Sequence, residues 1–163
     1  MGSEMCIRDR KYISYAPLIE NVNDAWAIDL FSSKGRDFLA LVDGFSGLLC
    51  CEKLSRTSSE DVIKVVERRM FEWGQPLAII SDNGPQFRGP FKNYLRVKGI
   101  VHSTSSQYHP QGNSLAESAV KNSKFLLEKC EEAGSNFAEA LFCLLYTSPS
   151  PRDLSTSRMP SSA

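Results

Sequence analysis

The stretch IISDNGPQF at residues 79–87, followed by YHPQGNSLAE at residues 108–117, carries two acidic residues at expected ends of secondary structure. Asp82 comes directly after a short apolar run, which is typical of a buried strand, and the Asn-Gly-Pro behind it favours a turn. Glu117 lies where a polar loop, residues 105–113, gives way to a helical pattern, so it is expected in the first turn of a helix. Two carboxylates are therefore predicted at the ends of elements, 35 positions apart in the chain.

A third acidic residue, Asp29, lies in the apolar segment WAIDL at residues 26–30. In the middle of a strand, a carboxylate that faces the core is costly unless a metal ion or a cation pairs with it. Each acid also has an ordinary explanation: Asp29 as a solvent-facing strand residue, Asp82 as a turn residue that bonds its own backbone, and Glu117 as the acidic member of a Ser-Leu-Ala-Glu capping box. Each of these explanations stays open when one acid is taken alone. Together, the three acids favour a carboxylate cluster that can hold divalent metal.

Three blocks of sequence resemble the catalytic core of retroviral and retrotransposon integrases, whose triad is written Asp, Asp-x35-Glu. The blocks are WAID at 26–29, SDNGPQF at 81–87, and YHPQ with AE within 108–117. They occur in the family's order and at nearly its spacing, and the resemblance covers residues 15–142. The second spacing is one residue shorter than the family's, and Gly-Asn-Ser at 112–114 stands where the family usually has a glycine just before the helix. The intervening residues are more similar to an integrase of a long-terminal-repeat retrotransposon than to one of a vertebrate retrovirus.

The resemblance implies a function in DNA integration. Water would trim the 3′ end of the retroelement DNA, and the new 3′ hydroxyl would attack a phosphodiester of target DNA. It implies two Mg2+ ions, or Mn2+, held by Asp29, Asp82 and Glu117, with Asp29 shared between both ions. Two such ions can activate an attacking oxygen and stabilise a leaving one, and hard carboxylate oxygens suit Mg2+. Two alternatives stay open: a DNA transposase of the same fold, and a domesticated or decayed core that binds DNA without catalysis.

Basic residues are concentrated around the acidic blocks, although the whole chain is neutral with 19 Lys+Arg and 19 Asp+Glu. Between residues 83 and 127, six basic residues accompany a single acidic one, Glu117. On a helix, Lys121 and Lys124 share the face of Glu117, where the family places DNA-contacting lysines; a solvated helix face is the alternative. The polar loop adds candidates for nucleotide contacts: Tyr108, His109, Gln111 and Asn113. The resemblance also implies DNA as the partner, both retroelement ends and target, and a homodimer or higher oligomer.

Composition fits a single domain, because 163 residues with 42% hydrophobic and 23% charged residues can form one sizeable core. The sequence contains no apolar run of about 18 residues, so neither a membrane-spanning helix nor a membrane partner is expected. The charged first ten residues are unlike a secretory signal, which predicts an intracellular protein. The resemblance implies action in the nucleus after passage through cytoplasmic virus-like particles. The cysteines lack metal-binding spacing, so neither a zinc site nor a disulfide framework is expected. The resemblance covers only the catalytic core, so the zinc-binding module and the small β-domain that usually flank such cores are not expected in this sequence.

The two ends of the chain are expected to derive from sequencing-adapter DNA. Residues 2–9 can be encoded by a DNA stretch whose reverse complement, read in another frame, encodes CLLYTSPSP, the sequence of residues 143–151. This DNA resembles a transposase adapter placed in opposite orientations at the two ends of an insert; a coincidental Ser/Pro-rich tail is the alternative. Residues 1–9 and 143–163 are therefore assigned to adapter sequence. Residues 10–142 are assigned to an integrase core fragment that is truncated at its C-terminal end.

The hydrophobic pattern predicts the element order βββαβαβα. Strands are expected at 25–30, 37–43, 47–53, 77–80 and 100–103, and helices from a cap at Thr57 or Ser58 to Trp73, at 90–98, and after residue 113. The first three strands are apolar on both faces, which is typical of a sheet covered by helices on both sides. This order predicts an α/β fold with a mixed sheet flanked by helices. The resemblance makes this fold ribonuclease-H-like, with five strands.

Overall fold

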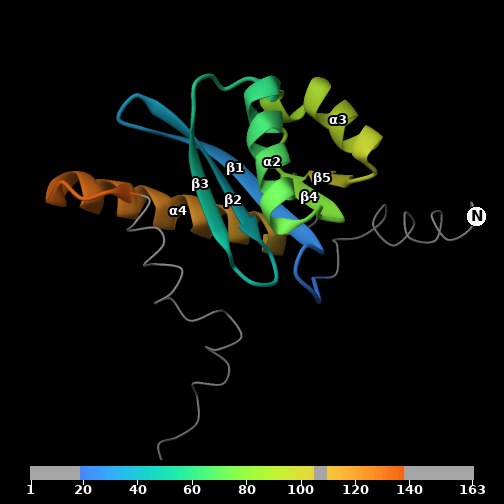
Figure 1. The fold of residues 1–163 in the computed structure, drawn as a ribbon, viewed down its shortest axis with the longest axis horizontal. Coiled ribbons are helices and arrows are strands. Elements are labelled where there is room, and N and C mark those ends of the chain that lie inside the picture. The colour runs from blue at the N-terminus through green and yellow to red at the C-terminus, as the bar shows by residue number, and fades with distance from the viewer. Residues whose placement is uncertain (1–18, 105–109, 138–163) are drawn as a thin grey trace, which may run out of the picture.

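The computed structural model of the chain describes residues 19–104 and 110–137. Their centre is a five-stranded mixed sheet in the order β3-β2-β1-β4-β5 (Figure 1). The first three strands form an antiparallel meander, and the last two continue the sheet in parallel with β1. The strands are β1 (Ala25–Ser33), β2 (Arg36–Asp43), β3 (Leu49–Leu54), β4 (Ala78–Ser81) and β5 (Val101–Thr104). The predicted mixed five-stranded sheet of a ribonuclease-H-like fold is confirmed.

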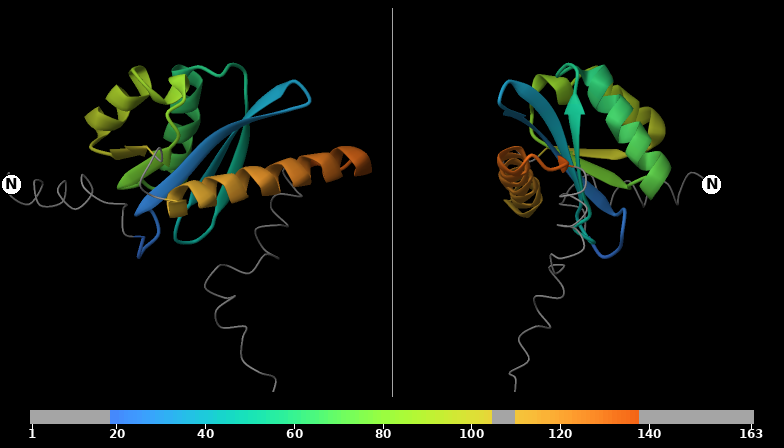
Figure 2. Two further views of the ribbon diagram at one scale, coloured as in Figure 1. Left: turned by 180° about the vertical axis from the view of Figure 1, so that it is seen from behind. Right: turned by 60° about the vertical axis from the view of Figure 1, so that its left-hand side comes forward.

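Helices cover both faces of this sheet. α2 (Ser59–Trp73) and α3 (Pro90–Lys98) lie on one face, and α4 (Pro110–Ala133) lies on the other, along β1 and β2 (Figure 2). A short 3-10 turn, η1 (Pro85–Phe87), follows β4 and leads into α3. Among the residues that the structure describes, no helix is long and apolar enough to cross a bilayer.

Side chains alternate along the strands, and this alternation divides the core into two layers. The layer beneath α2 and α3 contains Trp26, Ile28, Leu39, Leu41, Val62, Val66, Ile79, Phe91 and Leu95. The layer beneath α4 contains Ala27, Phe31, Phe38, Ala40, Ala116, Ala119 and Leu127. The strands are apolar on both faces because each face is covered by a helix, as their pattern predicts.

The two helices on the larger layer begin and end at local signals that the sequence shows. Ser58 is the N-cap of α2, where its side chain accepts a hydrogen bond from the N–H of Asp61 at 3.2 Å. Gly74 ends α2 with φ 93°, and Gly99 ends α3 in the left-handed region with φ 72°. Both glycines adopt backbone angles that other residues rarely take. The predicted bounds of these two helices are confirmed.

The start of α4 differs from the prediction. The helix begins at Pro110, so the expected polar loop at 105–113 ends earlier, and Glu117 lies two turns inside the helix and not in its first turn. Proline is tolerated at the first helical position, because an N–H there would lack a helical partner in any case. The capping box that starts at Ser114 is therefore ruled out, since its residues lie in the helix interior.

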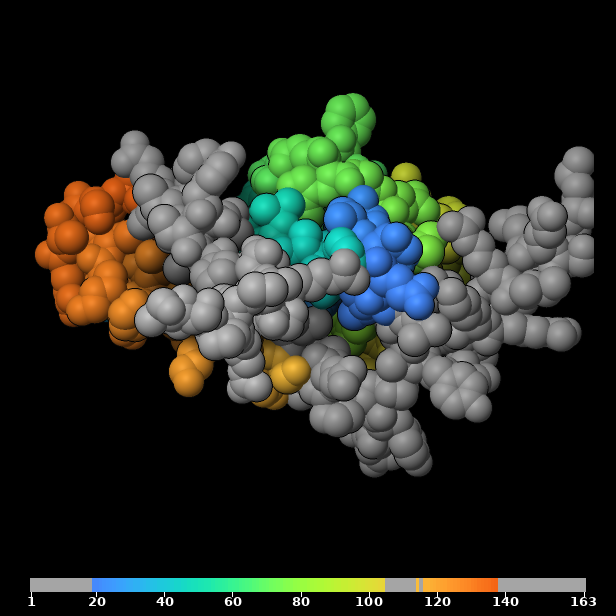
Figure 3. Space-filling view, turned by 90° about the horizontal axis from the view of Figure 1, so that it is seen from below, coloured from blue at the N-terminus to red at the C-terminus, as the bar shows by residue number. Residues whose placement is uncertain are grey.

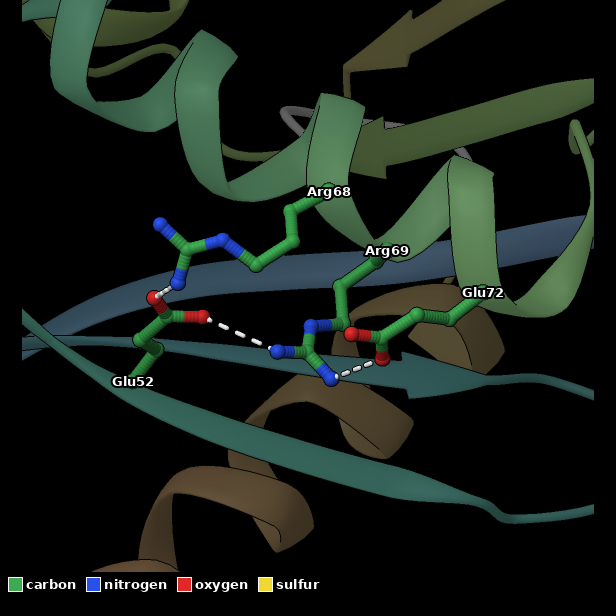
Figure 4. A network of polar contacts seen from close by, with 4 residues as sticks. All are labelled: Glu52, Arg68, Arg69 and Glu72. Carbon is green, nitrogen blue, oxygen red and sulfur yellow. Dashed lines mark hydrogen bonds and ion pairs between the residues drawn. The ribbon is translucent and has the colours of Figure 1, made fainter.

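The edge strand β3 is tied to α2 by charged side chains (Figure 4). Glu52 of β3 forms an ion pair with Arg68 through Oε1 and another with Arg69 through Oε2. The Arg69 pair measures 3.3 Å. Arg69 also pairs with Glu72 on the next turn of α2. This network anchors the outermost strand of the meander to the helix layer.

The segment before β1, residues 19–24, is hydrogen-bonded to the C-terminal end of α2. Asn23 donates a hydrogen bond from Nδ2 to the carbonyl of Trp73 at 2.7 Å and accepts one from the indole N–H of Trp26 at 2.9 Å. In the space-filling view this blue segment lies against the green end of α2 (Figure 3). These bonds fix the start of β1, the strand that carries Asp29.

Candidate active site

Asp29 and Asp82 belong to neighbouring parallel strands and lie at the same level. In the ladder between β1 and β4, Ala25 is opposite Ala78 and Ala27 is opposite Ile80. Continuing this register by two residues brings Asp29 opposite Asp82, the residue that directly follows β4. Residues two apart on a strand share a face. Both acids therefore belong to the face of the sheet that α4 covers.

Glu117 comes to the same place from α4. Its neighbour Ala116 is buried in the layer that also contains Ala27 and Phe31, the residues on either side of Asp29 on that face of β1. Asp82 and Glu117 are exposed, whereas Asp29 is half-buried. The three carboxylates, from a strand, a strand end and a helix, thus belong to the same side of the sheet, and Asp82 and Glu117 are near enough for their charges to act on Asp29.

The pKa of Asp29 reflects the nearby charges of Asp82 and Glu117. Burial raises the pKa of Asp29 above its usual value, and the N–H of Leu30, which donates to its Oδ1 at 2.8 Å, opposes the rise. The charges of Asp82 and Glu117 raise the pKa of Asp29 further, and that of Lys124 lowers it. The charged form of Asp29 is therefore disfavoured by the two other acids, which is the effect that a bound cation would reverse.

The carboxylates of Asp29, Asp82 and Glu117 suit a hard divalent cation by their chemistry, although their side chains do not form a closed metal site. Within residues 19–104 and 110–137, no three His, Cys, Asp or Glu side chains lie close enough together to count as a metal site. The three acids nevertheless offer only carboxylate oxygens, the ligands that Mg2+ prefers, and Mg2+ usually takes few protein carboxylates and keeps several waters. The residues fit the ion by charge and by ligand chemistry.

A tight turn orients Asp82. Its Oδ1 accepts a hydrogen bond from the N–H of Gly84 at 2.9 Å, so the expected turn role of Asp82 is confirmed. A Cβ at position 84 would lie 3.0 Å from this oxygen and 2.3 Å from Nε2 of Gln86. The turn role and the proposed role in the site are compatible, because the turn bond uses only one of the two carboxylate oxygens.

A partly buried pair next to Asp82, Ser81 and His102, was not predicted from the sequence. Ser81, which is 2% exposed, donates its hydroxyl proton to the carbonyl of Asp82 at 2.9 Å, and its Oγ lies 2.8 Å from Nε2 of His102. Since the single hydroxyl proton is already used, Nε2–H of His102 is the donor in this contact. The ring of Phe91 meets His102 edge-on at 5.5 Å. Burial, followed by the charge of Lys92, lowers the pKa of His102 to about 4, so the ring is neutral at neutral pH.

The predicted DNA-contacting residues fall into two groups. Lys121 and Lys124 are exposed on α4, and Lys124 lies with Nζ 5.6 Å from the ring centre of Phe31 while its charge acts on Asp29. Tyr108 and His109 lie outside the described residues. Gln111 and Asn113 lie in the first turn of α4, where the structure describes only their backbone. The structure places both lysines at the surface of α4, and their contacts with DNA, like those of the loop residues, stay predictions.

Known proteins show the same core. The family profile described as "Integrase core domain" matches residues 20–110, which is more than half of the chain. The "Intracisternal A-particle Pol-related polyprotein" of mouse intracisternal a-particle MIA14 is 29% identical over 111 residues, covering 65% of this chain and 13% of that polyprotein. The catalytic core domain of BIV integrase superposes with a TM-score of 0.66 at 20% identity, over 83% of this chain and 95% of that one. The HTLV-2 integrase catalytic core domain in complex with magnesium gives 0.62 at 25% identity, over 80% and 88%.

The chain belongs to the integrase core domain family, and its fold is that of the retroviral integrase catalytic cores. It spans only a small part of the curated polyproteins that it matches, 13% of the mouse one and 6% of the Gag-Pro-Pol polyprotein of squirrel monkey retrovirus. Membership of this family supports DNA integration as the general function and a polynucleotidyl transferase as the type of enzyme.

Proposed function

We propose that this chain is the catalytic core of a retroelement integrase that carries out 3′-end processing and strand transfer. One observation carries the proposal: Asp29, Asp82 and Glu117 come from three elements to one face of the sheet, and the charges of the last two act on the first. A single acid in a strand, a turn or a helix has a structural explanation. Two acids whose charges raise the pKa of the half-buried Asp29 instead lower the stability of the folded chain. Such a cost is expected at a functional site.

The three acids would hold a pair of divalent ions, Mg2+ or Mn2+. When bound, these ions supply activation of the attacking oxygen and stabilisation of the leaving oxygen in phosphoryl transfer. The similar catalytic core domain of HTLV-2 integrase, whose structure was solved in complex with magnesium, supports this assignment. Within the chain, Leu30 N–H and Gly84 N–H each fix one carboxylate oxygen, of Asp29 and of Asp82 respectively. Both carboxylates are thereby oriented by the backbone before any metal binds.

Self-association is part of the proposal. HTLV-2 integrase catalytic core has been solved in a dimeric form. Within residues 19–104 and 110–137, two large aromatic side chains are exposed, Phe71 on α2 at 96% and Phe125 on α4 at 61%. We propose a homodimer or higher oligomer that acts on nuclear DNA after passage through cytoplasmic virus-like particles. Sedimentation of the chain over a range of concentrations tests the oligomer.

Thermal unfolding in the presence of metal tests the assignment of the acids. A ligand that binds only the folded state raises stability by RT ln(1 + [L]/Kd). Mg2+ or Mn2+ is therefore expected to raise the melting temperature of the wild-type chain, and to leave that of Asp82→Asn unchanged. Glu60→Gln serves as the matched control, because Glu60 is an exposed acid on α2 outside the site. A metal-induced shift that persists in Asp82→Asn, or that is absent from the wild type, contradicts the proposal.

A further inference from the structure

Two linked hydrogen bonds connect β5 to the backbone of Asp82. His102 donates Nε2–H to Ser81 Oγ at 2.8 Å, and Ser81 donates its hydroxyl proton to the carbonyl of Asp82 at 2.9 Å. Hydrogen bonds that share a hydroxyl in this way polarise and strengthen one another. The imidazole therefore determines where the hydroxyl of Ser81 points, and the hydroxyl in turn holds the peptide group that follows Asp82.

These bonds hold Asp82 from the opposite side of the sheet. Ser81 lies two residues after Ile79, which belongs to the layer beneath α2 and α3, so the side chain of Ser81 belongs to that layer too. Asp82, the next residue, is on the face that α4 covers. α3 lies beside β5 (Figure 1), and its fully buried Phe91 meets the ring of His102 edge-on at 5.5 Å. The imidazole is thus fixed by packing as well as by its hydrogen bond.

The turn that follows Asp82 is held at its other end as well. Ser59, at the start of α2, donates its hydroxyl to the carbonyl of Gln86 at 2.8 Å, and Phe87 is buried in the core. Between these two anchors, the N–H of Gly84 binds Oδ1 of Asp82. The peptide groups on both sides of the turn are therefore fixed, and the turn leaves the second carboxylate oxygen of Asp82 to a ligand.

We propose that Ser81 and His102 are positioning residues for Asp82, which fix its peptide group so that its second carboxylate oxygen is presented to a divalent ion. In this role neither side chain touches the ion or the DNA. Partners behind a metal ligand orient that ligand, and losing one costs about 10-fold to 100-fold in metal affinity or activity.

A second observation supports a role for the imidazole. Within residues 19–104 and 110–137, Nδ1 of His102 is buried and has no hydrogen-bond partner. A buried polar atom without a partner is costly and calls for an explanation, and support of a functional site is one. The inference rests on the proposed function, because it adds positioning residues to the same acids.

Binding of Mn2+ to the folded chain, measured from the EPR signal of the free ion, tests the pair. Ser81→Ala removes the hydroxyl and His102→Leu removes the N–H donor, so each is expected to raise the Kd for Mn2+ by about tenfold. Ser81→Thr retains a hydroxyl and His102→Gln retains an N–H donor, so both should stay near the wild-type Kd. Each removal breaks the linked bonds, so one folded variant of the two is enough for the test.

Val66→Ala is the control for a general loss of stability. Val66 is a fully buried residue of α2 that takes no part in these hydrogen bonds. Its truncation is expected to lower the melting temperature and to leave the Kd for Mn2+ unchanged. Circular dichroism at the assay temperature checks that every variant is folded.

A wild-type Kd in folded Ser81→Ala or His102→Leu overturns the inference. So does an equal rise in their conservative counterparts or in Val66→Ala, because shape or stability would then explain the loss. Asp82→Asn separates these failures from a failure of the proposed function. If the wild type binds Mn2+ and Asp82→Asn does not, the acids hold the ion, and only the positioning role fails. If the wild type binds no Mn2+, or Asp82→Asn binds it equally well, the proposed site and this inference both fail.

Discussion

His102 makes the stability of this domain depend on pH in a direction that the structure specifies. The unfolded imidazole has a pKa of about 6.5, whereas burial and the charge of Lys92 lower the pKa of His102 to about 4 in the fold. Between these two values the unfolded chain holds more protons than the folded one, so the free energy of unfolding rises with pH across this window. Acidification from pH 7 to pH 4 is therefore expected to remove the contribution of the neutral ring.

The size of this effect follows from the shift. A difference of about 2.5 pKa units corresponds to about 3.4 kcal/mol at about 1.36 kcal/mol per unit, and because His102 is only half-buried, solvent screening reduces the expected value to about 2 kcal/mol. His102→Gln removes the titration and retains an N–H donor for Ser81 Oγ. The difference in unfolding free energy between wild type and His102→Gln should thus fall by about 2 kcal/mol from pH 7 to pH 4.

Urea unfolding at a series of pH values measures that difference, and Asp29 and the other acids cancel in it because both proteins carry them. His109→Gln provides the matched control, since His109 is the second of the two histidines in the chain. Stability curves for wild type and His102→Gln that run parallel from pH 7 to pH 4 would refute the reasoning about the Ser81–His102 pair.

Three further outcomes are expected. Asp29→Asn should raise the melting temperature of the metal-free chain, because it removes a half-buried charge that Asp82 and Glu117 repel; a lower melting temperature would contradict this account. Glu52→Gln should lower the unfolding free energy by about 1 kcal/mol, since it removes the carboxylate that pairs with the exposed Arg68 and with the mostly buried Arg69, which keeps Glu72 as its second partner. Lys64→Gln, which breaks an ion pair whose lysine is exposed, should change it by less than about 0.5 kcal/mol. Lys121→Glu/Lys124→Glu should weaken DNA binding for every sequence and flatten its salt dependence, with little change in the melting curve; an unchanged salt slope would remove both lysines from the DNA-binding surface.

Local signals allowed most of the fold to be predicted from sequence. Ser58, Gly74 and Gly99 act through their own backbone and nearest neighbours, so the ends of α2 and α3 could be predicted without tertiary information. The start of α4 could not, because Gly112 and Asn113 are typical of loops and Pro110 is compatible both with a loop and with a first helical turn.

The site depends on longer-range relations. Because β1 is apolar on both sides, its sequence does not show which face of the sheet Asp29 belongs to. That face follows only from the pairing of β1 with β4 and from the packing of α4. The Ser81–His102 pair depends on the register of β4 against β5, which no local pattern specifies. The resemblance to integrases supplied what the periodicity lacked, because it identified which three acids belong together.

Metal-dependent strand transfer by single-acid variants tests the central claim most directly. The wild-type chain and Asp29→Asn, Asp82→Asn, Glu117→Gln and the control Glu60→Gln would be compared in one assay with Mg2+ or Mn2+, after circular dichroism has shown that each is folded. The three-acid site predicts that the wild type and Glu60→Gln join the two DNA strands and that each of the other three variants does not. Strand transfer at the wild-type rate by a folded Asp29→Asn, Asp82→Asn or Glu117→Gln protein would contradict it.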